Sequence, residues 1–330
     1  MPELRRDPIV GRWVIIATER GKRPSDFKMR VPAKKAGFCA FCNGNEYTTP
    51  PEIIANRPEG SEPNTPGWTL RVVPNKFPAL RIERQLNTTG DELFSKMDGI
   101  GAHEVIIENP DHYLTLSTMP LRSVEDTLLA FHQRISDLKK DSRLKYALVF
   151  KNEGEAAGAS LEHSHSQLIA LPIVPKQVQE ELNNSRHYHE ANKSCIFCDI
   201  IRHEINDRTR VISENESYIS LAPFAPTSPF ETWILPKDHE SSFVPDGKLP
   251  LLAQLLQKTL KQIDKVLDLP PYNMILHISP FEDESNEYYH WHMEIKPTLT
   301  KKAGFEWGSG FYINPTPPEE AAKFMRESGI

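Results

Sequence analysis

Two short segments of the sequence carry paired histidines, "HSH" at His163–His165 and "HWH" at His290–His292. Side chains alternate between the two faces of a strand, so histidines two positions apart lie on the same face. An imidazole serves as a metal ligand, a general base or a nucleophile. The paired segments therefore predict sites where chemistry or metal binding is concentrated.

The four cysteines of the chain form two Cys-x-x-Cys motifs, Cys39 with Cys42 and Cys195 with Cys198. One interpretation is a pair of redox or disulfide motifs, but structural disulfides are rare in cytosolic proteins. The other is half of a zinc site, because this spacing presents two thiolates to one tetrahedral centre. The second interpretation requires two further ligands for each motif.

An internal repeat supplies those ligands. The segments "HEVIIENPDH" (His103–His112) and "FETWILPKDH" (Phe230–His239) share a glutamate, an apolar run and a terminal Asp-His. In both copies the terminal histidine lies 51 positions before the first histidine of the paired segment. Matched elements in the same order indicate a duplicated unit. The expected boundaries are 1–180 and 181–330.

The segments between these motifs predict the same elements in each copy. An amphipathic helix is predicted from Ser123, which we expect to cap it with Asp126 three residues on. The second copy shows the same apolar spacing over 251–269. A strand is predicted after each helix, from Tyr146 and from Tyr272. The sequence thus indicates a mixture of helices and strands in each copy.

Each copy offers two cysteines and two histidines, the donor set that structural zinc prefers. A single loop histidine is usually a solvated side chain, but eight candidate ligands at parallel positions favour metal binding. We therefore predict two structural zinc sites per chain, formed by Cys39, Cys42, His112 and His163, and by Cys195, Cys198, His239 and His290.

His165 remains after the ligands are assigned, and we interpret it as a nucleophile toward phosphorus. Gln167 follows on the same face and could donate a hydrogen bond to a phosphoryl oxygen as charge develops. The preceding glycine- and alanine-rich segment, 152–160, suits the approach of an anion to backbone N–H groups. The alternative is an ordinary, partly buried strand histidine.

The parallel position in the second copy is His292, which is followed by Met293 and Glu294. The glutamine is missing there, and the preceding segment "FEDESNE" is acidic and would repel phosphate. We expect the first copy to be catalytic and the second to be a scaffold.

Composition excludes several classes of function. The net charge is −6 and the pI about 6.1, so a basic surface for nucleic acid is not expected. No run approaches the roughly 20 apolar residues that span a bilayer, and the N-terminal segment lacks a signal-peptide core. We expect a cytoplasmic protein without nucleic-acid or membrane partners.

The sequence resembles the galactose-1-phosphate uridylyltransferase family of the histidine-triad superfamily over essentially its whole length. The resemblance is carried by the segments "RRDPIVGRWVIIATERGKRPSDF", "CAFC", "VVPNKFPAL", "GAHEVIIENPDH", "VFKNEGEAAGASLEHSHSQ" and "FEWGSGFYINPTPPEEAAKFMRE". The motif His-Ser-His-Ser-Gln is similar to the branch that includes ADP-glucose phosphorylase-like enzymes. Better-known bacterial uridylyltransferases carry His-Pro-His-Gly-Gln. The implied fold is α+β: two tandem histidine-triad-like units, each an antiparallel sheet with a packed helix.

The resemblance also implies a mechanism. The second histidine of the motif attacks the α-phosphorus of a nucleotide sugar, releases a hexose 1-phosphate and passes the nucleotidyl group to an acceptor. It implies a homodimer whose partner completes the site, metals that hold the fold, and no redox cofactor. The residues carried over are His165 and Gln167 as catalytic groups, and Arg20, Arg23, Asn75, Asn152 and Ser160 as substrate contacts.

Several alternatives stay open at this level. UDP-glucose with galactose 1-phosphate is the first expectation, and ADP-glucose with inorganic phosphate is the second, because the two serines of the motif leave the base preference undecided. A dinucleoside polyphosphate hydrolase is less favoured, since Gln167 stands where a third histidine would be expected. A zinc-stabilised interaction module would leave His165 without purpose. Some family members bind their second metal through histidines matching His277, His290 and His292, and His277 has no assigned role here.

Overall fold

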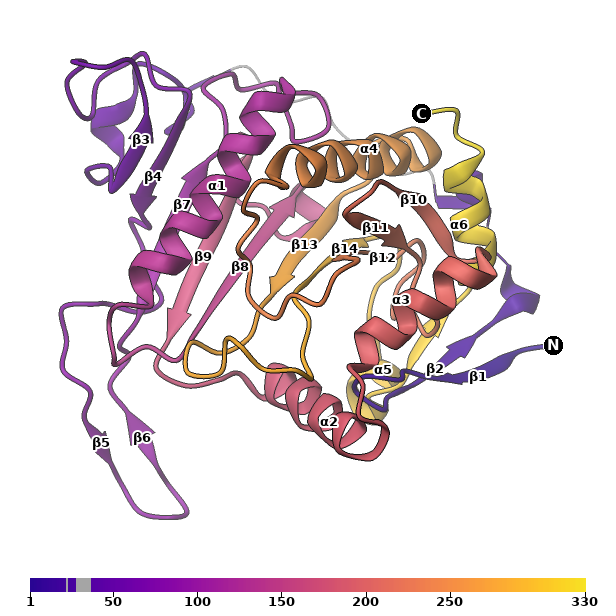
Figure 1. Cartoon of the computed structure of the whole chain (residues 1–330). Helices are drawn as coiled ribbons and strands as arrows, with labels where there is room; N and C mark the ends of the chain where they lie inside the picture. The colour runs from indigo at the N-terminus through magenta and orange to yellow at the C-terminus, as the bar shows by residue number, and fades with distance from the viewer. Residues whose placement is uncertain (22, 28–36) are drawn as a thin grey trace.

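The computed structural model describes residues 1–21, 23–27 and 37–330, and its centre is one ten-stranded antiparallel sheet (Figure 1). The strands follow the order β3-β4-β7-β9-β8-β13-β14-β12-β11-β10. Their bounds are β3 (Ile54–Asn56), β4 (Leu70–Pro74), β7 (Ala102–Ile107), β8 (Tyr146–Glu153), β9 (His165–Leu171), β10 (Val211–Glu214), β11 (Tyr218–Leu221), β12 (Thr232–Pro236), β13 (Tyr272–His277) and β14 (His292–Pro297).

The two halves of this sheet repeat each other about its middle. Reading outward from the centre gives β8-β9-β7-β4-β3 on one side and β13-β14-β12-β11-β10 on the other. The halves meet where β8 pairs with β13, with Asn273 opposite Asn152 and Met274 opposite Lys151. The internal duplication and the α+β class are therefore confirmed, and the two half-sheets are hydrogen-bonded into one.

One long helix from each half packs on the sheet, α1 (Leu121–Leu138) and α4 (Leu249–Leu267), and the two helices contact each other (Figure 1). The expected cap at Ser123 is wrong. The helix begins at Leu121 after Pro120, and no side chain caps it. Proline fits a helix start because its missing N–H would have no intrahelical partner there. Ser123 lies inside the first turn, where its carbonyl accepts the Thr127 hydroxyl at 2.8 Å.

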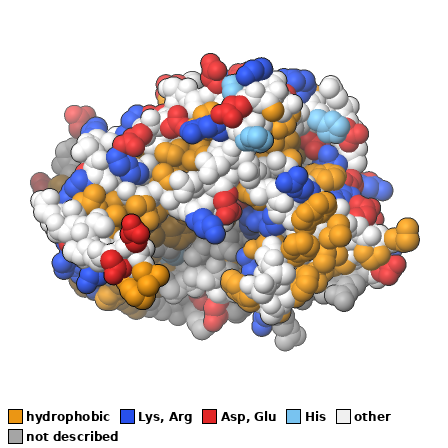
Figure 2. All heavy atoms as spheres, turned by 90° about the horizontal axis from the view of Figure 1, so that it is seen from below, with side chains coloured by type: hydrophobic (Ala, Val, Ile, Leu, Met, Phe, Trp, Pro, Cys, Tyr) orange, Lys and Arg blue, Asp and Glu red, His pale blue; other side chains and the backbone are white. Residues whose placement is uncertain are grey.

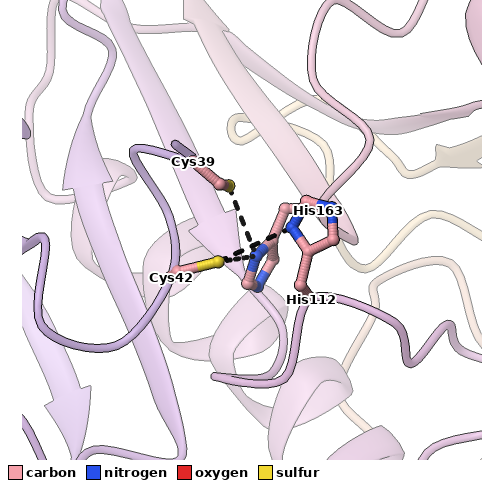
Figure 3. Close-up of side chains that lie close together, drawn as sticks. All are labelled: Cys39, Cys42, His112 and His163. Atoms are coloured by element: carbon pink, nitrogen blue, oxygen red, sulfur yellow. Dashed lines mark hydrogen bonds between the residues drawn. The ribbon is translucent and has the colours of Figure 1, made fainter. Parts of the chain in front are cut away.

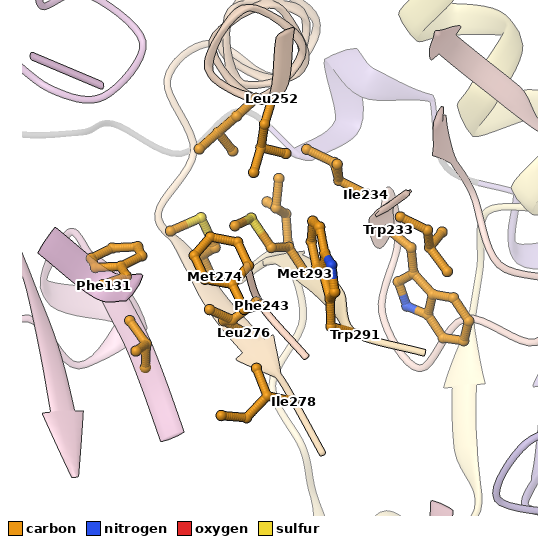
Figure 4. Close-up of a cluster of buried hydrophobic side chains, with 14 of the residues drawn as sticks. Phe131, Trp233, Ile234, Phe243, Leu252, Met274, Leu276, Ile278, Trp291 and Met293 are labelled. Carbon is orange, nitrogen blue, oxygen red and sulfur yellow. The ribbon is translucent and has the colours of Figure 1, made fainter. Parts of the chain in front are cut away.

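The hydrophobic core lies between the helices and the sheet. Figure 4 shows Leu252 of α4 above Met274 and Leu276 of β13 and Met293 of β14. Trp291 is fully buried, and its ring meets that of Phe243 edge-on with centroids 5.0 Å apart. Each side chain of this size contributes about 1.5–3 kcal/mol when it is removed from water. The strands that begin at His165 and His292 thus belong to a sheet that packs on a buried core.

The remaining elements surround the sheet. The terminal segments meet in a small sheet in which β15 runs parallel to β2, and a hairpin of β5 and β6 projects from the body (Figure 1). The bounds are β1 (Glu3–Arg6), β2 (Trp13–Ile16), β5 (Thr88–Thr89), β6 (Lys96–Met97), β15 (Tyr312–Asn314), α2 (Lys176–Asn192), α3 (Ile196–Asp207), α5 (Gly304–Ser309), α6 (Pro318–Arg326) and the 3-10 turns η1 (Thr18–Arg20), η2 (Pro24–Phe27), η3 (Glu46–Thr48) and η4 (Glu155–Ala157).

Across the described ranges, no helix combines the length and the apolar character that crossing a membrane requires.

Candidate active site and metal clusters

The first predicted ligand set comes together in the first half of the chain. Cys39 and Cys42 lie in a turn before β3, His112 follows β7, and His163 precedes β9 (Figure 3). The Nδ1 atom of His163 is 3.6 Å from both sulfurs, and Nδ1 of His112 is 3.6 Å from Sγ of Cys42. All four ligand atoms lie within 4.8 Å of one another. Two sulfurs and two ring nitrogens are a donor set that fits zinc.

The orientation of His163 supports this fit. Its Nε2 atom is 2.6 Å from the carbonyl oxygen of Asn109, which can only accept, so Nε2 carries the proton. The lone pair of Nδ1 then faces the two sulfurs. A backbone carbonyl that fixes the tautomer of a ligating histidine is a usual feature of metal sites.

The second set also comes together, with its four ligand atoms within 4.8 Å of one another. Cys195 immediately precedes α3 and Cys198 lies in its first turn, while His239 follows β12 and His290 precedes β14. Sγ of Cys198 is 3.4 Å from Nδ1 of His239 and 3.8 Å from Nδ1 of His290. Nε2 of His290 lies 2.9 Å from the carbonyl oxygen of Pro236. None of the four cysteines forms a disulfide, so both pairs are available as ligands.

His165 begins β9 on the same face as His163, since both rings contact Phe41, at centroid distances of 5.3 and 6.2 Å. Nδ1 of His165 is 2.8 Å from the carbonyl oxygen of His163, so Nδ1 carries the proton and Nε2 keeps its lone pair. Burial, together with the charge of Lys151, lowers the pKa of His165. A neutral ring with a free Nε2 is the form that a nucleophile needs.

The opposite face of the same strand is held by a buried charged network. The hydroxyls of Ser164 and Ser166 donate to the two carboxylate oxygens of Glu108, at 2.6 and 2.5 Å. Lys151 donates to Glu108 at 2.9 Å and to the carbonyl oxygen of His165 at 3.3 Å. Burial opposes the charge of Glu108, but Lys151 and the serines hold its pKa below the usual value. The network fixes the backbone that presents His165.

Gln167 lies beside two residues of neighbouring segments. Its Oε1 atom is 2.9 Å from Nε2 of His103 and 3.4 Å from Nδ2 of Asn75. The structure therefore brings Asn75 to the same part of the site as Gln167. His103 also belongs to this part of the site, although the sequence analysis did not identify it.

Asn152 is oriented by the other half of the molecule. Nδ2 of Asn273 donates to the carbonyl oxygen of Ala157 at 2.8 Å and to Oδ1 of Asn152 at 2.9 Å. The amide N–H groups of Asn152 are thereby turned away from Asn273 and toward the glycine-rich segment, where a Cβ at Gly158 would lie 3.7 Å from Nδ2. Ser160 is exposed at the end of this segment.

Of the two predicted arginine contacts, the structure describes the side chain of Arg23 only. Arg23 is exposed, and its segment is anchored through Phe27, whose ring meets that of Phe230 in the second half at 6.3 Å. Within the part of the chain that the structure describes, Arg23 makes no ion pair or hydrogen bond with His165 or Gln167. The side chain of Arg20 lies outside the described residues.

In the second half, other side chains pack closely around the corresponding histidine, His292. The ring of His292 stacks on His277 with centroids 4.6 Å apart and packs against Trp233 at 5.5 Å. His277 lies between Glu181 and Glu294, with N–O distances of 3.2 and 3.3 Å. Burial opposes its charge, but these carboxylates raise the pKa of His277 to about 10. His277, without a role in the sequence analysis, is thus a buried ion-pair partner.

These packed groups also form a third set of possible ligands, because donor atoms of Glu181, His277 and His292 lie within 4.8 Å of one another. Burial and the charge of His277 lower the pKa of His292 to about 4. His292 is buried between aromatic rings with carboxylates nearby, which makes this position unfavourable for a phosphate.

Sequence reasoning missed four residues that support the site: His103, Glu108, Lys151 and Asn273. The alternation of β9 does place Ser164 and Ser166 opposite His165, so a polar partner on that face was foreseeable. Its identity was not, because Glu108, directly after β7, and Lys151 of β8 reach this face through pairings distant in sequence.

Comparisons with known proteins agree with this architecture. The model of the galactose-1-phosphate uridyl transferase N-terminal domain matches residues 1–175, and that of the C-terminal domain matches residues 181–314. An ADP-glucose phosphorylase of Arabidopsis thaliana is 42% identical over 100% of this chain and 93% of its own length. A galactose-1-phosphate uridylyltransferase of Thermotoga maritima is 29% identical, over 100% of this chain and 99% of its own.

A solved structure gives the same result. The crystal structure of an ADP-glucose phosphorylase from Arabidopsis thaliana with bound ADP-glucose has a TM-score of 0.84 and 38% identity, covering 100% of both chains. A uridylyltransferase structure has a TM-score of 0.76 and 28% identity, over 99% of this chain and 98% of the other. The resemblance found in the sequence is confirmed: this chain belongs to the galactose-1-phosphate uridyl transferase family and is a nucleotidyltransferase.

Proposed function

We propose that His165 transfers a nucleoside monophosphate between a nucleoside diphosphate hexose and a second phosphate acceptor. The lone pair of Nε2 attacks the α-phosphorus, the bond from phosphorus to the bridging oxygen breaks, and hexose 1-phosphate leaves with the electron pair. The acceptor's phosphate oxygen then attacks the nucleotidyl-histidine and releases Nε2. The observation that carries the proposal is the bond from Nδ1 to the carbonyl of His163, which leaves Nε2 unprotonated.

Neighbouring side chains are suited to the phosphate groups. We assign to Gln167 the donation of a hydrogen bond to the α-phosphoryl oxygen, which strengthens as negative charge develops. The amides of Asn75 and Asn152 and the hydroxyl of Ser160 serve as further substrate contacts. Their support is their placement around the end of β9 and the glycine-rich segment.

Arg20 and Arg23 fit this scheme if the molecule is a homodimer. The segment of Arg23 is anchored on the second half through the contact of Phe27 with Phe230. In a dimer, the partner's copies of these arginines would grip the substrate phosphates bidentately. Figure 2 shows hydrophobic side chains gathered in separate groups on one face, as surfaces available for such a contact.

The two Cys-His clusters are proposed zinc sites. Cys39, Cys42, His112 and His163 would hold one ion, and Cys195, Cys198, His239 and His290 the other. Bound zinc would tie each Cys-x-x-Cys segment to its half-sheet, and the first ion would fix His163 beside His165. We further propose units bounded at 1–180 and 181–330 and a cytoplasmic location, in keeping with the symmetry of the sheet and the acidic composition.

Two substrate pairs have support. UDP-glucose with galactose 1-phosphate is favoured by the family models and by the Thermotoga maritima relative. ADP-glucose with inorganic phosphate is favoured by a specific observation, the 42% identity over the whole chain with a protein named ADP-glucose phosphorylase. Both UDP-glucose and ADP-glucose are therefore tested as donors.

The test is the intact mass of the protein after separate incubation with UDP-glucose and ADP-glucose. We expect an adduct of the size of UMP or AMP, absent in His165→Asn and retained in the matched control His187→Asn, an exposed histidine of α2. Release of hexose 1-phosphate is measured in parallel. A protein that gives neither adduct nor hexose 1-phosphate contradicts the proposal, and release of free nucleotide to water would indicate a hydrolase.

A further inference from the structure

His103 lies next to Gln167 without touching the nucleophile. It stands near the start of β7, partly buried, and the pairing of β7 with β9 sets Val105 opposite Gln167. Residues 103 and 105 share a face, so His103 is the diagonal neighbour of Gln167 across the two strands. The distance from Nε2 of His103 to Oε1 of Gln167 is 2.9 Å.

The tautomer of His103 is determined by the backbone. The N–H of Ala79 donates to Nδ1 of His103, with the two nitrogens 3.1 Å apart. A neutral imidazole that accepts at one nitrogen carries its proton on the other. Nε2 is therefore a donor, and the group 2.9 Å away on Gln167 must be the carbonyl oxygen rather than the amide nitrogen.

Asn75 independently requires the same orientation. Its Oδ1 accepts the backbone N–H of Phe77 at 2.9 Å, so its Nδ2 is directed outward as a donor. That Nδ2 lies 3.4 Å from Oε1 of Gln167 and 3.1 Å from Nε2 of His103. Two donors cannot bond to each other, but both can bond to the two lone pairs of one carbonyl oxygen. Turning the Gln167 amide over would bring its N–H groups against two donors.

We propose that His103 is a positioning residue that holds the amide of Gln167 so that its N–H groups point at the substrate phosphoryl oxygen. Among the described residues, Nε2 of Gln167 has no hydrogen-bond partner and so stays available. This inference rests on the proposed transfer through His165. A glutamine free to turn over would present its carbonyl oxygen to the phosphoryl oxygen in part of the molecules, and repel it.

The second half of the chain supports the inferred link between His103 and Gln167. Positions 103 and 167 correspond, at the repeat offset of 127 residues, to Phe230 and Glu294. The side chain of Phe230 can neither donate nor accept a hydrogen bond, and that of Glu294 has no amide to orient. Both members of the pair are therefore replaced together in the half whose histidine is enclosed by aromatic rings.

The test is a double-mutant cycle of His103→Phe and Gln167→Ala, with kcat and KM measured for the nucleotide sugar. Loss of one preorganised donor costs about 10²–10³ in kcat. We expect Gln167→Ala to show a loss of this order and His103→Phe to lower kcat roughly 10-fold or more, with KM changed much less. In the Gln167→Ala background, His103→Phe should change kcat by less than about twofold, because its effect acts through Gln167.

The outcomes separate this inference from the proposed function. If both substitutions lower kcat and their effects multiply, His103 does not act through Gln167 and the inference is overturned. If Gln167→Ala leaves kcat unchanged, the role proposed for Gln167 and the inference about His103 both fail. The transfer itself is tested separately by His165→Asn. His187→Phe is the matched control. Thermal melts identify a variant that does not fold, in which case His103→Ala replaces His103→Phe in the cycle.

Discussion

Lys151 is a single residue that supports the candidate site from the face of β9 opposite His165. Its side chain is fully buried, with Nζ 2.9 Å from Glu108, 3.1 Å from Glu153 and 2.9 Å from the hydroxyl of Ser164. Burial works against its charge, but Glu108 and Glu153 outweigh that effect and raise its pKa. The lysine is thus a buried cation. Its removal would leave the carboxylate of Glu108, which accepts from both serines of the motif, without a cationic partner.

We predict that Lys151→Met lowers the free energy of unfolding by about 3–5 kcal/mol, because it leaves Glu108 buried and unpaired. Urea denaturation measures this loss. The double variant Lys151→Met with Glu108→Gln should be less destabilised than the single one, since no charge is then left without a partner. Lys258→Met, on the exposed side of α4, is the control. Equal stability of Lys151→Met and this control would show that Glu108 does not depend on Lys151.

At the scale of elements, the junction of β8 and β13 links the halves through the site. Asn273 of β13 donates to Asn152 at the end of β8 and to the loop carbonyl of Ala157. The registers of the two halves also differ. Gln167 lies opposite Val105, but Glu294 lies opposite Trp233 rather than Thr232, one residue beyond the repeat offset. This shift accompanies the packing of Trp233 on His292.

We expect Asn273→Ala to raise KM for the nucleotide sugar with a smaller effect on kcat, because the amide of Asn152 loses the bond that directs it. One hydrogen bond contributes about 1 kcal/mol, so KM should rise roughly 3- to 10-fold. Steady-state kinetics with the preferred donor measures this. Asn192→Ala, which removes an exposed bond to the Tyr188 carbonyl in α2, is the control. An unchanged KM would mean that β13 does not orient Asn152.

At the scale of the whole molecule, one Cys-His cluster stands in each half, and each joins a Cys-x-x-Cys segment to the ends of two strands. We predict two zinc ions per chain by metal analysis and a cooperative loss of structure on chelation. Structural zinc contributes apparent binding free energies of about 10–16 kcal/mol.

The variants Cys42→Ser and Cys198→Ser should each reduce the zinc content to about one ion per chain. Circular dichroism during titration with a chelator follows the fold. Because the first cluster adjoins His165, Cys42→Ser should lower activity more than Cys198→Ser at equal stability. Less than one zinc in the unsubstituted protein would contradict both sites.

The sequence by itself determined the duplication and the grouping of the two Cys-His sets, and it singled out His165 as the candidate nucleophile. These rest on spacing along the chain, which covalent connectivity preserves, and on the two-residue period of a strand. The resemblance to the uridylyltransferases added the order of the chemical steps.

Tertiary structure alone decided what surrounds those residues. The fusion of two half-sheets, the position of Lys151 and Glu108 beneath β9, and the contact of His103 with Gln167 all depend on pairings between segments distant in sequence. Many sequences satisfy the same periodicity, and only packing selects which strands become neighbours and in which register. The same reason explains why the cap expected at Ser123 was wrong, since the helix starts one turn earlier, after Pro120.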